Sequence, residues 1–318
     1  MVWLDKWLGR PLVVLLRLFM SAVTRPRAGD AGPLRKLVIA KFLGMGSIVE
    51  AMPLVARLKA DHPDVKMIFL TFAGNAPLLR LISAVDEIVI IDASGFIAFT
   101  LSSLRALWRL RTIAPDAVLT LEFFSRYAAL MSVLSGAPVR VGFHAVSAAD
   151  VGSVWTHRVH LIQQKHISEN FLVFSEALKS PVGQDGIIKS RMPRLPTDTR
   201  GLIELSDDMV RESKAVLLRH GVQGSYIVLS PTCSPFSRDL KLWPDAHWNK
   251  LAAILKEQTG MRLLATGRKQ ERGMVERALA PHALNLAGEL SFEAMVSVLA
   301  GARLVVSLDS GPAHLASF

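Results

Sequence analysis

The sequence has a single cysteine, Cys233, among its 318 residues. One thiol excludes an intramolecular disulfide and any zinc or iron–sulfur site built from several cysteines. This scarcity fits a reducing compartment, and we expect the protein to be cytoplasmic. Low-complexity tracts are also absent, and the shares of 51% hydrophobic and 20% charged residues are typical of a folded globular protein.

No apolar run is long enough to cross a membrane. In the most apolar stretch near the N-terminus, Arg10 and Arg17 leave only six uncharged positions between them, whereas a span needs about 20 apolar residues. Arg17 also interrupts the stretch that a signal peptide would need, and no convincing small-residue cleavage site follows it. We therefore expect neither a membrane span nor a signal peptide.

Acidic residues are too few to balance the basic ones, and the net charge is +10. Such a charge favours an acidic partner, which is a nucleic acid, an anionic membrane or a phosphorylated substrate. Half of the excess lies in residues 1–36, where seven basic minus two acidic residues give +5. No aromatic-basic recognition motif accompanies this charge, so we expect no nucleic-acid partner.

The N-terminal segment, residues 1–35, is both basic and amphipathic. A helix would align Lys6, Arg10 and Arg17 on one side, beside many Leu, Val and Trp residues. Such a helix can bind the surface of an anionic membrane through residues 1–25, or it can dock on the protein's own second domain. The sequence does not choose between these two interpretations.

The remaining chain is long enough for two hydrophobic cores. From Lys36 onward, short β-branched runs alternate with helical patterns, which is typical of βαβ units and parallel sheets. In the first half, strands are predicted at 37–41, 65–71, 87–91, 117–121 and 139–142, and helices near 48–60, 76–83, 99–112 and 124–135. These elements predict an N-terminal Rossmann-like domain over residues 36–180.

Residues 181–204 are rich in proline, glycine and charge, and we expect them to be a linker. Beyond them, strands are predicted at 226–230, 262–266 and 304–307, and helices near 206–220, 244–258, 270–280 and 291–300. This pattern predicts a second, C-terminal Rossmann-like domain over 205–318. Ligands of such open α/β sheets bind at the carboxyl ends of the strands.

A glycine-containing turn follows the first predicted strand. Gly44 and Gly46 permit a tight turn and a close backbone approach at the start of a helix. A dinucleotide fingerprint would place a third glycine where Glu50 stands, and an acidic residue at the end of the second strand, where Leu70 to Phe72 lie. The sequence therefore disfavours an NAD enzyme.

Three turns of the second domain carry polar side chains after predicted strands. After strand 226–230, the hydroxyls of Thr232 and Ser237 and the ammonium of Lys241 can donate to phosphate oxygens, although an ordinary polar loop is equally compatible. After strand 262–266, Glu271 can accept hydrogen bonds from a ribose or can favour a helix start through its charge.

The turn after strand 304–307 is the strongest candidate for a diphosphate site. Asp309 and Ser310 can cap the helix that follows, where backbone amides are exposed. His314 taken singly is more often a packed or surface histidine than a ligand or catalyst. Cys233 is better interpreted as a small buried filler than as a thiol nucleophile.

These segments occur in the order found in glycosyltransferase family 9, the heptosyltransferase family, and the sequence resembles that family over nearly all of residues 36–318. The first turn matches in Gly46-Ser47 followed by Pro53. The later matches are Lys241-Leu-Trp243-Pro244, Gly267 with Glu271, Asn285-Leu286-Ala287-Gly288, and Asp309-Ser310-Gly311 with His314.

The resemblance implies the α/β GT-B architecture, in which two Rossmann-like domains with parallel sheets face each other across a cleft. It implies an inverting, metal-independent transfer of sugar from a nucleotide-sugar donor, with no cofactor, and the best-known donor of the family is ADP-heptose. The acceptor would be a lipopolysaccharide-type, lipid-linked or other cell-envelope saccharide, held by the N-terminal domain at the inner face of the cytoplasmic membrane.

The resemblance also implies roles for the donor-side residues. Ser237 and Lys241 would contact the diphosphate and Glu271 the ribose. Lys241 would offset the charge of the leaving group in place of a metal. Contacts with the phosphates and the sugar would come from Asp309, Ser310, Gly311 and His314.

The chain departs from the family at the residue that looks like the general base. The family has an aspartate after the glycine of the first turn, and this chain has Ser47, which cannot serve as a base unaided. Glu50 follows three residues later and can reach the same place, or it is a surface helix glutamate. A catalytically impaired sugar-nucleotide-binding homologue therefore stays open as an alternative.

An alternative reaction and the extent of the C-terminal domain also follow from the resemblance. A nucleotide-sugar epimerase on the same architecture is also an alternative, because a fold does not determine a reaction. Family members usually continue through another strand and closing helices after the position of Phe318, so we expect the C-terminal domain of this sequence to be truncated.

Overall fold

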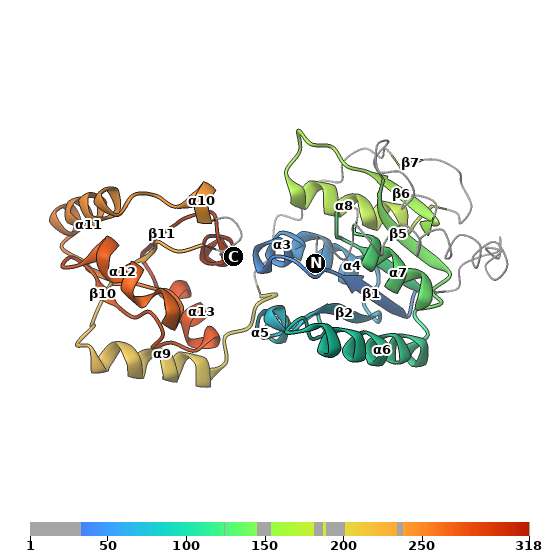
Figure 1. Cartoon of the computed structure of the whole chain (residues 1–318), viewed down its shortest axis with the longest axis horizontal. Helices are drawn as coiled ribbons and strands as arrows, with labels where there is room; N and C mark the ends of the chain where they lie inside the picture. Colours follow the sequence, from blue (N-terminus) through green and yellow to red (C-terminus); the bar gives the residue numbers. More distant parts are fainter. Residues whose placement is uncertain are drawn as a thin grey trace. The chain divides into compact units, whose positions relative to one another are not determined.

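The computed structural model describes residues 33–123, 125–144, 154–180, 187–188, 201–233 and 238–317. The chain divides into two compact units, Met1–Leu202 and Ile203–Phe318 (Figure 1). The amphipathic segment predicted at the N-terminus lies outside the described residues, as does most of the predicted linker. Residues 187–188 of that linker pair with a strand of the first unit, so the predicted end of the first domain at residue 180 is too early.

The first unit is built on a seven-stranded parallel sheet with the strand order β3-β2-β1-β4-β5-β6-β7. Strands β1 and β4 are neighbours, and Leu37 of β1 is in register with Ala117 of β4. The strands are β1 (Lys36–Ala40), β2 (Lys66–Phe72), β3 (Glu87–Ile91), β4 (Ala117–Thr120), β5 (Val139–His144), β6 (His157–His160) and β7 (Ile187–Ile188). The helices are α3 (Met45–Glu50), α4 (Met52–Asp61), α5 (Ala76–Arg80), α6 (Phe96–Ile113), α7 (Arg126–Leu134) and α8 (Ile167–Ala177).

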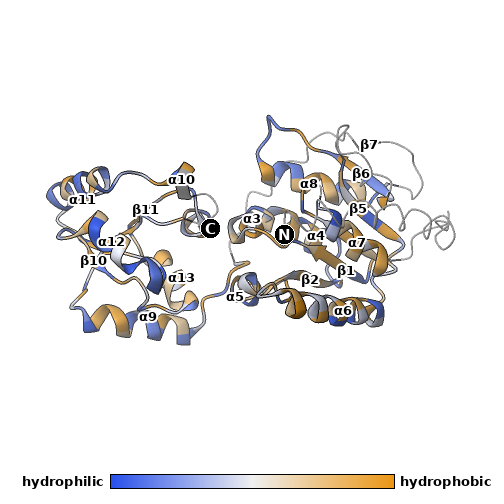
Figure 2. Cartoon of the chain, viewed as in Figure 1, coloured by the Kyte–Doolittle hydropathy of each residue, from blue (hydrophilic) through white to orange (hydrophobic). Residues whose placement is uncertain are grey.

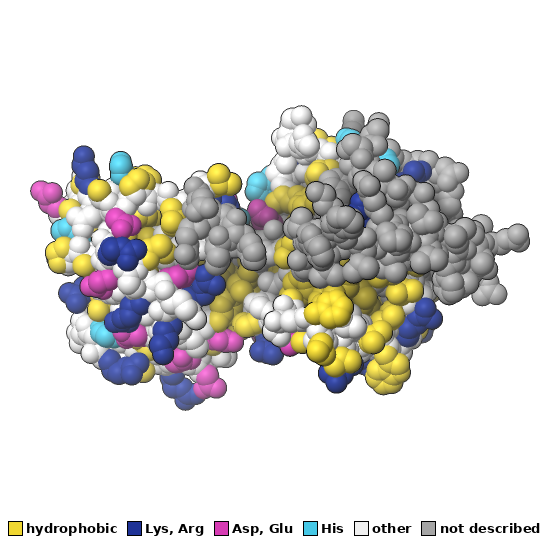
Figure 3. Space-filling view, in the orientation of Figure 1, with side chains coloured by type: hydrophobic (Ala, Val, Ile, Leu, Met, Phe, Trp, Pro, Cys, Tyr) yellow, Lys and Arg dark blue, Asp and Glu magenta, His cyan; other side chains and the backbone are white. Residues whose placement is uncertain are grey.

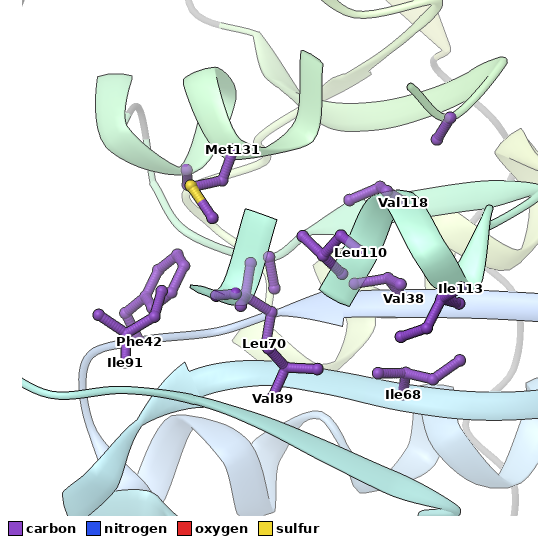
Figure 4. Packing of buried hydrophobic residues seen from close by; sticks show 14 of the residues in the cluster. Val38, Phe42, Ile68, Leu70, Val89, Ile91, Leu110, Ile113, Val118 and Met131 are labelled. Atoms are coloured by element: carbon purple, nitrogen blue, oxygen red, sulfur yellow. The ribbon is translucent and has the colours of Figure 1, made fainter. Parts of the chain in front are cut away.

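Alternating side chains of the strands form the core of this unit. Val38 of β1 and Ile68 of β2 pack with Leu110 of α6 and Met131 of α7 in one buried cluster (Figure 4). Because successive strand residues point to opposite faces, α6 and α7 cover one face of the sheet. On the other side, α4 and α8 pack against each other.

The structure confirms the predicted strands of the first half and corrects the bounds of the helices. The helix predicted near 76–83 ends at Arg80, and the helix predicted near 99–112 begins at Phe96. The predicted helix 48–60 is two helices, α3 and α4, separated at Ala51. Pro53 lies in the first turn of α4, where its missing N–H is tolerated, and it cannot continue the hydrogen bonding of α3. The helix predicted near 124–135 begins at Arg126, because the Ser125 hydroxyl accepts a hydrogen bond from the N–H of Ala128.

The second unit has a four-stranded parallel sheet with the order β10-β9-β8-β11. Its strands are β8 (Tyr226–Ser230), β9 (Arg262–Ala265), β10 (Leu284–Asn285) and β11 (Leu304–Ser307). Its helices are α9 (Asp207–Arg219), α10 (Arg238–Lys241), α11 (Asp245–Thr259), α12 (Arg272–Leu279), α13 (Phe292–Ala300) and α14 (Gly311–Ala316), and one 3₁₀ turn, η4 (Lys269–Glu271), precedes α12. The helix predicted at 270–280 is therefore η4 followed by α12.

Candidate active site

Three loops of the second unit meet at the carboxyl edge of its sheet. They follow β8, β9 and β11, which are adjacent strands. The backbone N–H of Leu308 donates to the carbonyl of Ser230 (3.3 Å), and the hydroxyls of Ser230 and Thr266 lie 2.5 Å apart. Residues that are distant in sequence are thus held at one edge, where open α/β sheets bind ligands.

Lys241, Asp309 and His314 form a cluster of polar side chains at this edge. The Lys241 ammonium donates to Oδ2 of Asp309 at 2.6 Å, and Oδ1 lies 3.4 Å from Nε2 of His314. The hydrogen bond from Lys241 lowers the pKa of Asp309 below its ordinary value of 3.8, and burial opposes this shift. The Lys241 side chain is 37% exposed, and its ammonium also donates to the backbone carbonyl of Asp309 at 3.3 Å.

Ser310 and Gly311 lie beside this cluster at the start of α14. Ser310 occupies the N-cap position, but its hydroxyl makes no capping hydrogen bond and lies 3.2 Å from the hydroxyl of Ser307. The Asp309 carboxylate is held by Lys241. The expectation that these two side chains cap the helix is therefore wrong. Space around Gly311 is open, with no atom within 4 Å of the place that a Cβ would take.

Glu271 is buried in the second unit, with 5% of its side chain exposed. Its Oε2 accepts from the Arg268 backbone at 2.8 Å, its Oε1 accepts from the Arg268 guanidinium at 2.7 Å, and the Thr232 hydroxyl also contacts it. The carboxylate thus ties the loop after β8 to the turn after β9. Its predicted contact with a ribose stays a prediction.

The turn after β1 carries the acceptor-side candidates of the first unit. Gly44 precedes α3 with a positive φ of 83°, a conformation that favours glycine. The Ser47 hydroxyl lies over Gly44, 3.1 Å from the place that a Cβ there would take. Gly46, Ser47 and Glu50 all lie on α3 and are half-buried.

A buried ion pair that the sequence analysis missed supports this turn. The Lys41 ammonium donates to Glu122 Oε1 at 2.9 Å, and the two side chains are only 3% and 8% exposed. The same oxygen accepts from the backbone N–H groups of Phe42 (2.6 Å) and Leu43 (2.8 Å). Glu122 directly follows the segment predicted as strand 117–121. A polar residue at the carboxyl end of a strand is a candidate site residue, and this position could have identified Glu122.

Comparison with known proteins identifies the family. The sequence profile described as glycosyltransferase family 9 (heptosyltransferase) matches residues 104–317, which is more than half of the chain. The chain belongs to glycosyltransferase family 9. This glycosyltransferase is similar to lipopolysaccharide heptosyltransferase 1 of Escherichia coli (strain K12), with 24% identity over 295 residues that cover 88% of this chain and 83% of the relative.

Solved structures share the fold of this family 9 glycosyltransferase. The E. coli heptosyltransferase WaaC with ADP-2-deoxy-2-fluoro heptose superposes with a TM-score of 0.68 and 21% identity, over 89% of this chain and 85% of that chain. A glycosyl transferase family 9 protein from Veillonella parvula gives a TM-score of 0.68 at 16% identity, over 89% and 77%. The glycosyltransferase is an α/β protein with the GT-B fold.

One expectation about this glycosyltransferase concerns its single thiol, and metal independence stays a prediction. Cys233 is a free, buried cysteine, as the interpretation of a small core residue predicts. In the part of the chain that the structure describes, no three His, Cys, Asp or Glu side chains are grouped so that they could hold a metal ion. Ser237, a predicted donor contact, lies outside the described residues.

Glu271 makes the stability of the glycosyltransferase dependent on pH in the acidic range. Burial raises the pKa of its carboxyl, but the bonds from Arg268 and Thr232 outweigh burial, so that the pKa lies below its ordinary 4.5. A carboxylate whose pKa is lower in the folded state than in the unfolded state stabilises the protein at pH values above the pKa of the unfolded state. This contribution is lost as the pH falls through the pKa of the folded state.

We therefore expect Glu271→Gln to destabilise the second unit by roughly 1–2 kcal/mol at neutral pH and to flatten its acid dependence below about pH 4.5. Urea unfolding at neutral and acidic pH measures both effects. Glu257→Gln, an exposed glutamate of α11, is the matched control. An unchanged acid dependence in Glu271→Gln would contradict the assignment.

The turn at Asn285–Gly288 packs against the turn after β9. Gly288 has a φ of 80°, and a Cβ there would lie 2.7 Å from the backbone Cα of Lys269. Gly288→Ala is expected to cost at least about 2 kcal/mol of unfolding free energy. Gly260→Ala is the matched control, because Gly260 has a φ of 64° in open space. Equal losses in the two variants, measured by urea unfolding, would show that the close approach has no effect.

Proposed function

We propose that the chain transfers a sugar from a nucleotide sugar to a saccharide acceptor, with the donor bound at the carboxyl edge of the second sheet. The contact of Lys241 with Asp309 carries this proposal. It places the exposed Lys241 side chain beside the start of α14, at the edge where β8 and β11 end. A diphosphate needs such a cation, together with the hydroxyl and amide donors of the neighbouring loops.

We propose an inverting, metal-independent transfer that requires no cofactor. In this reaction the acceptor oxygen attacks the anomeric carbon from the side opposite to the diphosphate, and the bond to the diphosphate oxygen breaks. Negative charge then develops on the leaving group. Lys241 stabilises that charge, with Ser237 and Thr232 as further donors and Glu271 on the ribose.

ADP-heptose is the proposed donor, and a lipopolysaccharide-type or other lipid-linked saccharide is the proposed acceptor. The names of the relatives support this choice, since they include lipopolysaccharide heptosyltransferases 1 and 3. We propose that the protein works at the inner face of the cytoplasmic membrane. Residues 1–25, which are basic and amphipathic in sequence, would contribute peripheral contact with anionic lipid.

The donor assignment is tested by calorimetric titration of the full chain with ADP-heptose and a panel of other nucleotide sugars. Binding of ADP-heptose that is lost in Asp309→Ala is the expected result. Asp64→Ala, at an exposed aspartate of the first unit, is the matched control. No binding of any nucleotide sugar would overturn the proposal, and binding without transfer to any saccharide acceptor would favour a catalytically impaired homologue.

The general base is proposed to be Glu50, because Ser47 at the family's base position has no carboxylate. Both residues belong to α3, and the loop at its start is held by Glu122. Glu50→Gln is expected to lower kcat by about 10²-fold or more with little change in donor affinity, and Ser47→Asp in that background is expected to restore part of the rate. If Glu50→Gln transfers sugar as fast as the parent protein, Glu50 is not the base.

A further inference from the structure

Helix α6 carries an apolar surface that its own unit does not cover. One side of the helix packs on the sheet through buried Ala106, Leu110 and Ile113. Large apolar side chains on the rest of the helix are exposed to solvent. They are Phe96 (67%), Ile97 (73%), Leu101 (48%), Leu104 (59%) and Trp108 (70%).

Four of these side chains form a continuous stripe. Ile97, Leu101, Leu104 and Trp108 are spaced by four, three and four residues, which places them on one side of an α-helix. The orange of apolar residues in Figure 2 runs along α6. In the space-filling view, yellow side chains gather where Figure 1 places α6, with Lys and Arg side chains in dark blue at their border (Figure 3).

The border of the stripe is basic. Helix α6 contains three arginines and no acidic residue. Arg109 is bound to Glu87 by two hydrogen bonds of 2.7 and 2.9 Å. Arg105 and Arg111 are exposed on the two sides of the stripe, and among the described residues neither forms an ion pair with a carboxylate. Arg111 donates from Nε to the carbonyl of Leu134.

We propose that α6 is a membrane-surface helix that lies on an anionic phospholipid bilayer. The apolar stripe enters the boundary between headgroups and acyl chains, Trp108 lies in the interfacial layer that tryptophan prefers, and Arg105 and Arg111 contact lipid phosphates. No described helix, α6 included, is long and apolar enough to cross a membrane. The helix therefore binds in the plane of the surface.

Charge distinguishes the bilayer from other occupants of the stripe. A second copy packed symmetrically would bring the same basic border to both sides, without acidic residues from α6 to pair it. The N-terminal segment of the chain is apolar but carries +5 over residues 1–36, so its charge has the same sign as the border. An anionic lipid surface complements both the apolar stripe and its arginines. This inference does not depend on the sugar or the nucleotide of the proposed reaction.

A fluorescent label on the stripe tests the proposal in the full chain. Leu104→Cys provides an exposed thiol, whereas Cys233 is buried. Labelled with an environment-sensitive dye, position 104 is expected to move to an apolar environment on addition of vesicles of equal parts phosphatidylcholine and phosphatidylglycerol. Leu218→Cys, at a leucine of α9 that is 62% exposed, is the matched control and is expected to show no change.

Vesicle binding by unlabelled variants gives the second readout. Leu104→Glu is expected to weaken binding to the anionic vesicles by at least about tenfold, and Arg105→Glu to weaken it in a salt-dependent way. Leu218→Glu is expected to bind as the parent protein does. All three variants should keep the parent's urea-unfolding midpoint, because the substituted side chains are exposed. An unchanged midpoint shows that the variants are folded.

Three outcomes would overturn the proposal. The first is a label at position 104 that does not respond to anionic vesicles, and the second is parental vesicle binding by Leu104→Glu. The third is a label that already reports an apolar environment without vesicles. In that case, the mass measured by sedimentation tells whether a second copy or the chain's own N-terminal segment covers the stripe.

Discussion

Glu122→Leu is expected to lower the unfolding free energy of the first unit by about 3–5 kcal/mol. The substitution leaves the Lys41 ammonium, which is 3% exposed, without its carboxylate. It also removes the acceptor for the N–H groups of Phe42 and Leu43. The buried cation and the buried N–H of Phe42 each cost free energy when they lose their partner, and the half-buried N–H of Leu43 adds less. The leucine side chain makes no hydrogen bond that replaces these.

Urea unfolding of the full chain measures this loss, and two further variants separate its causes. Glu122→Gln keeps an acceptor for the backbone but removes the charge, so an intermediate loss is expected. Lys41→Met combined with Glu122→Leu removes both charges and should be less destabilised than Glu122→Leu alone. A single Glu122→Leu variant as stable as the parent protein would show that the pair contributes nothing net.

Lys241→Ala is expected to lower kcat/KM for sugar transfer by about 10²–10³-fold. The ammonium is the cation that the proposed mechanism places on the leaving diphosphate, and its loss leaves that charge to the hydroxyl and amide donors alone. Lys241→Arg keeps the charge with a different geometry, so an intermediate rate is expected. Steady-state transfer with the cognate donor is the measurement.

Lys256→Ala is the matched control for this prediction, because it removes one exposed lysine of α11 in the same unit. It should leave kcat/KM unchanged. If Lys241→Ala and Lys256→Ala behave alike, the cluster at Asp309 does not act on the leaving group.

Eight strands were predictable because their apolar, β-branched runs are short and are bounded by turns. Strands β7 and β10 were missed because they have only two residues each. Strand β6 was missed because His157–His160 offers only one β-branched residue. It is held beside β5 by the Thr156 hydroxyl, which accepts from the backbone of Arg140 at 2.7 Å. Helix α8 was missed although His166 and Glu169 form a capping box at its start, because histidine is not among the usual N-cap residues.

The polar residues of the second unit's site were predictable singly, whereas Glu122 of the first unit was missed and the contacts of both groups were not predicted. Lys41 and Glu122 are 81 residues apart and meet because β1 lies next to β4. Lys241 and Asp309 are 68 residues apart and meet because β8 lies next to β11. Strand order is a property of the whole sheet, so turn motifs indicate candidate residues without indicating which of them touch.

The paired hydrogen bonds between Arg109 and Glu87 have a mechanical consequence. Glu87 is the first residue of β3 and also binds Lys66 at the start of β2 at 2.8 Å. These bonds add to the packing of Ala106, Leu110 and Ile113, which holds α6 on the sheet. The sheet of the first unit and α6 therefore move as one body. A surface that α6 contacts therefore sets the orientation of the whole first unit. It also sets the distance between that surface and the turn that contains Ser47 and Glu50.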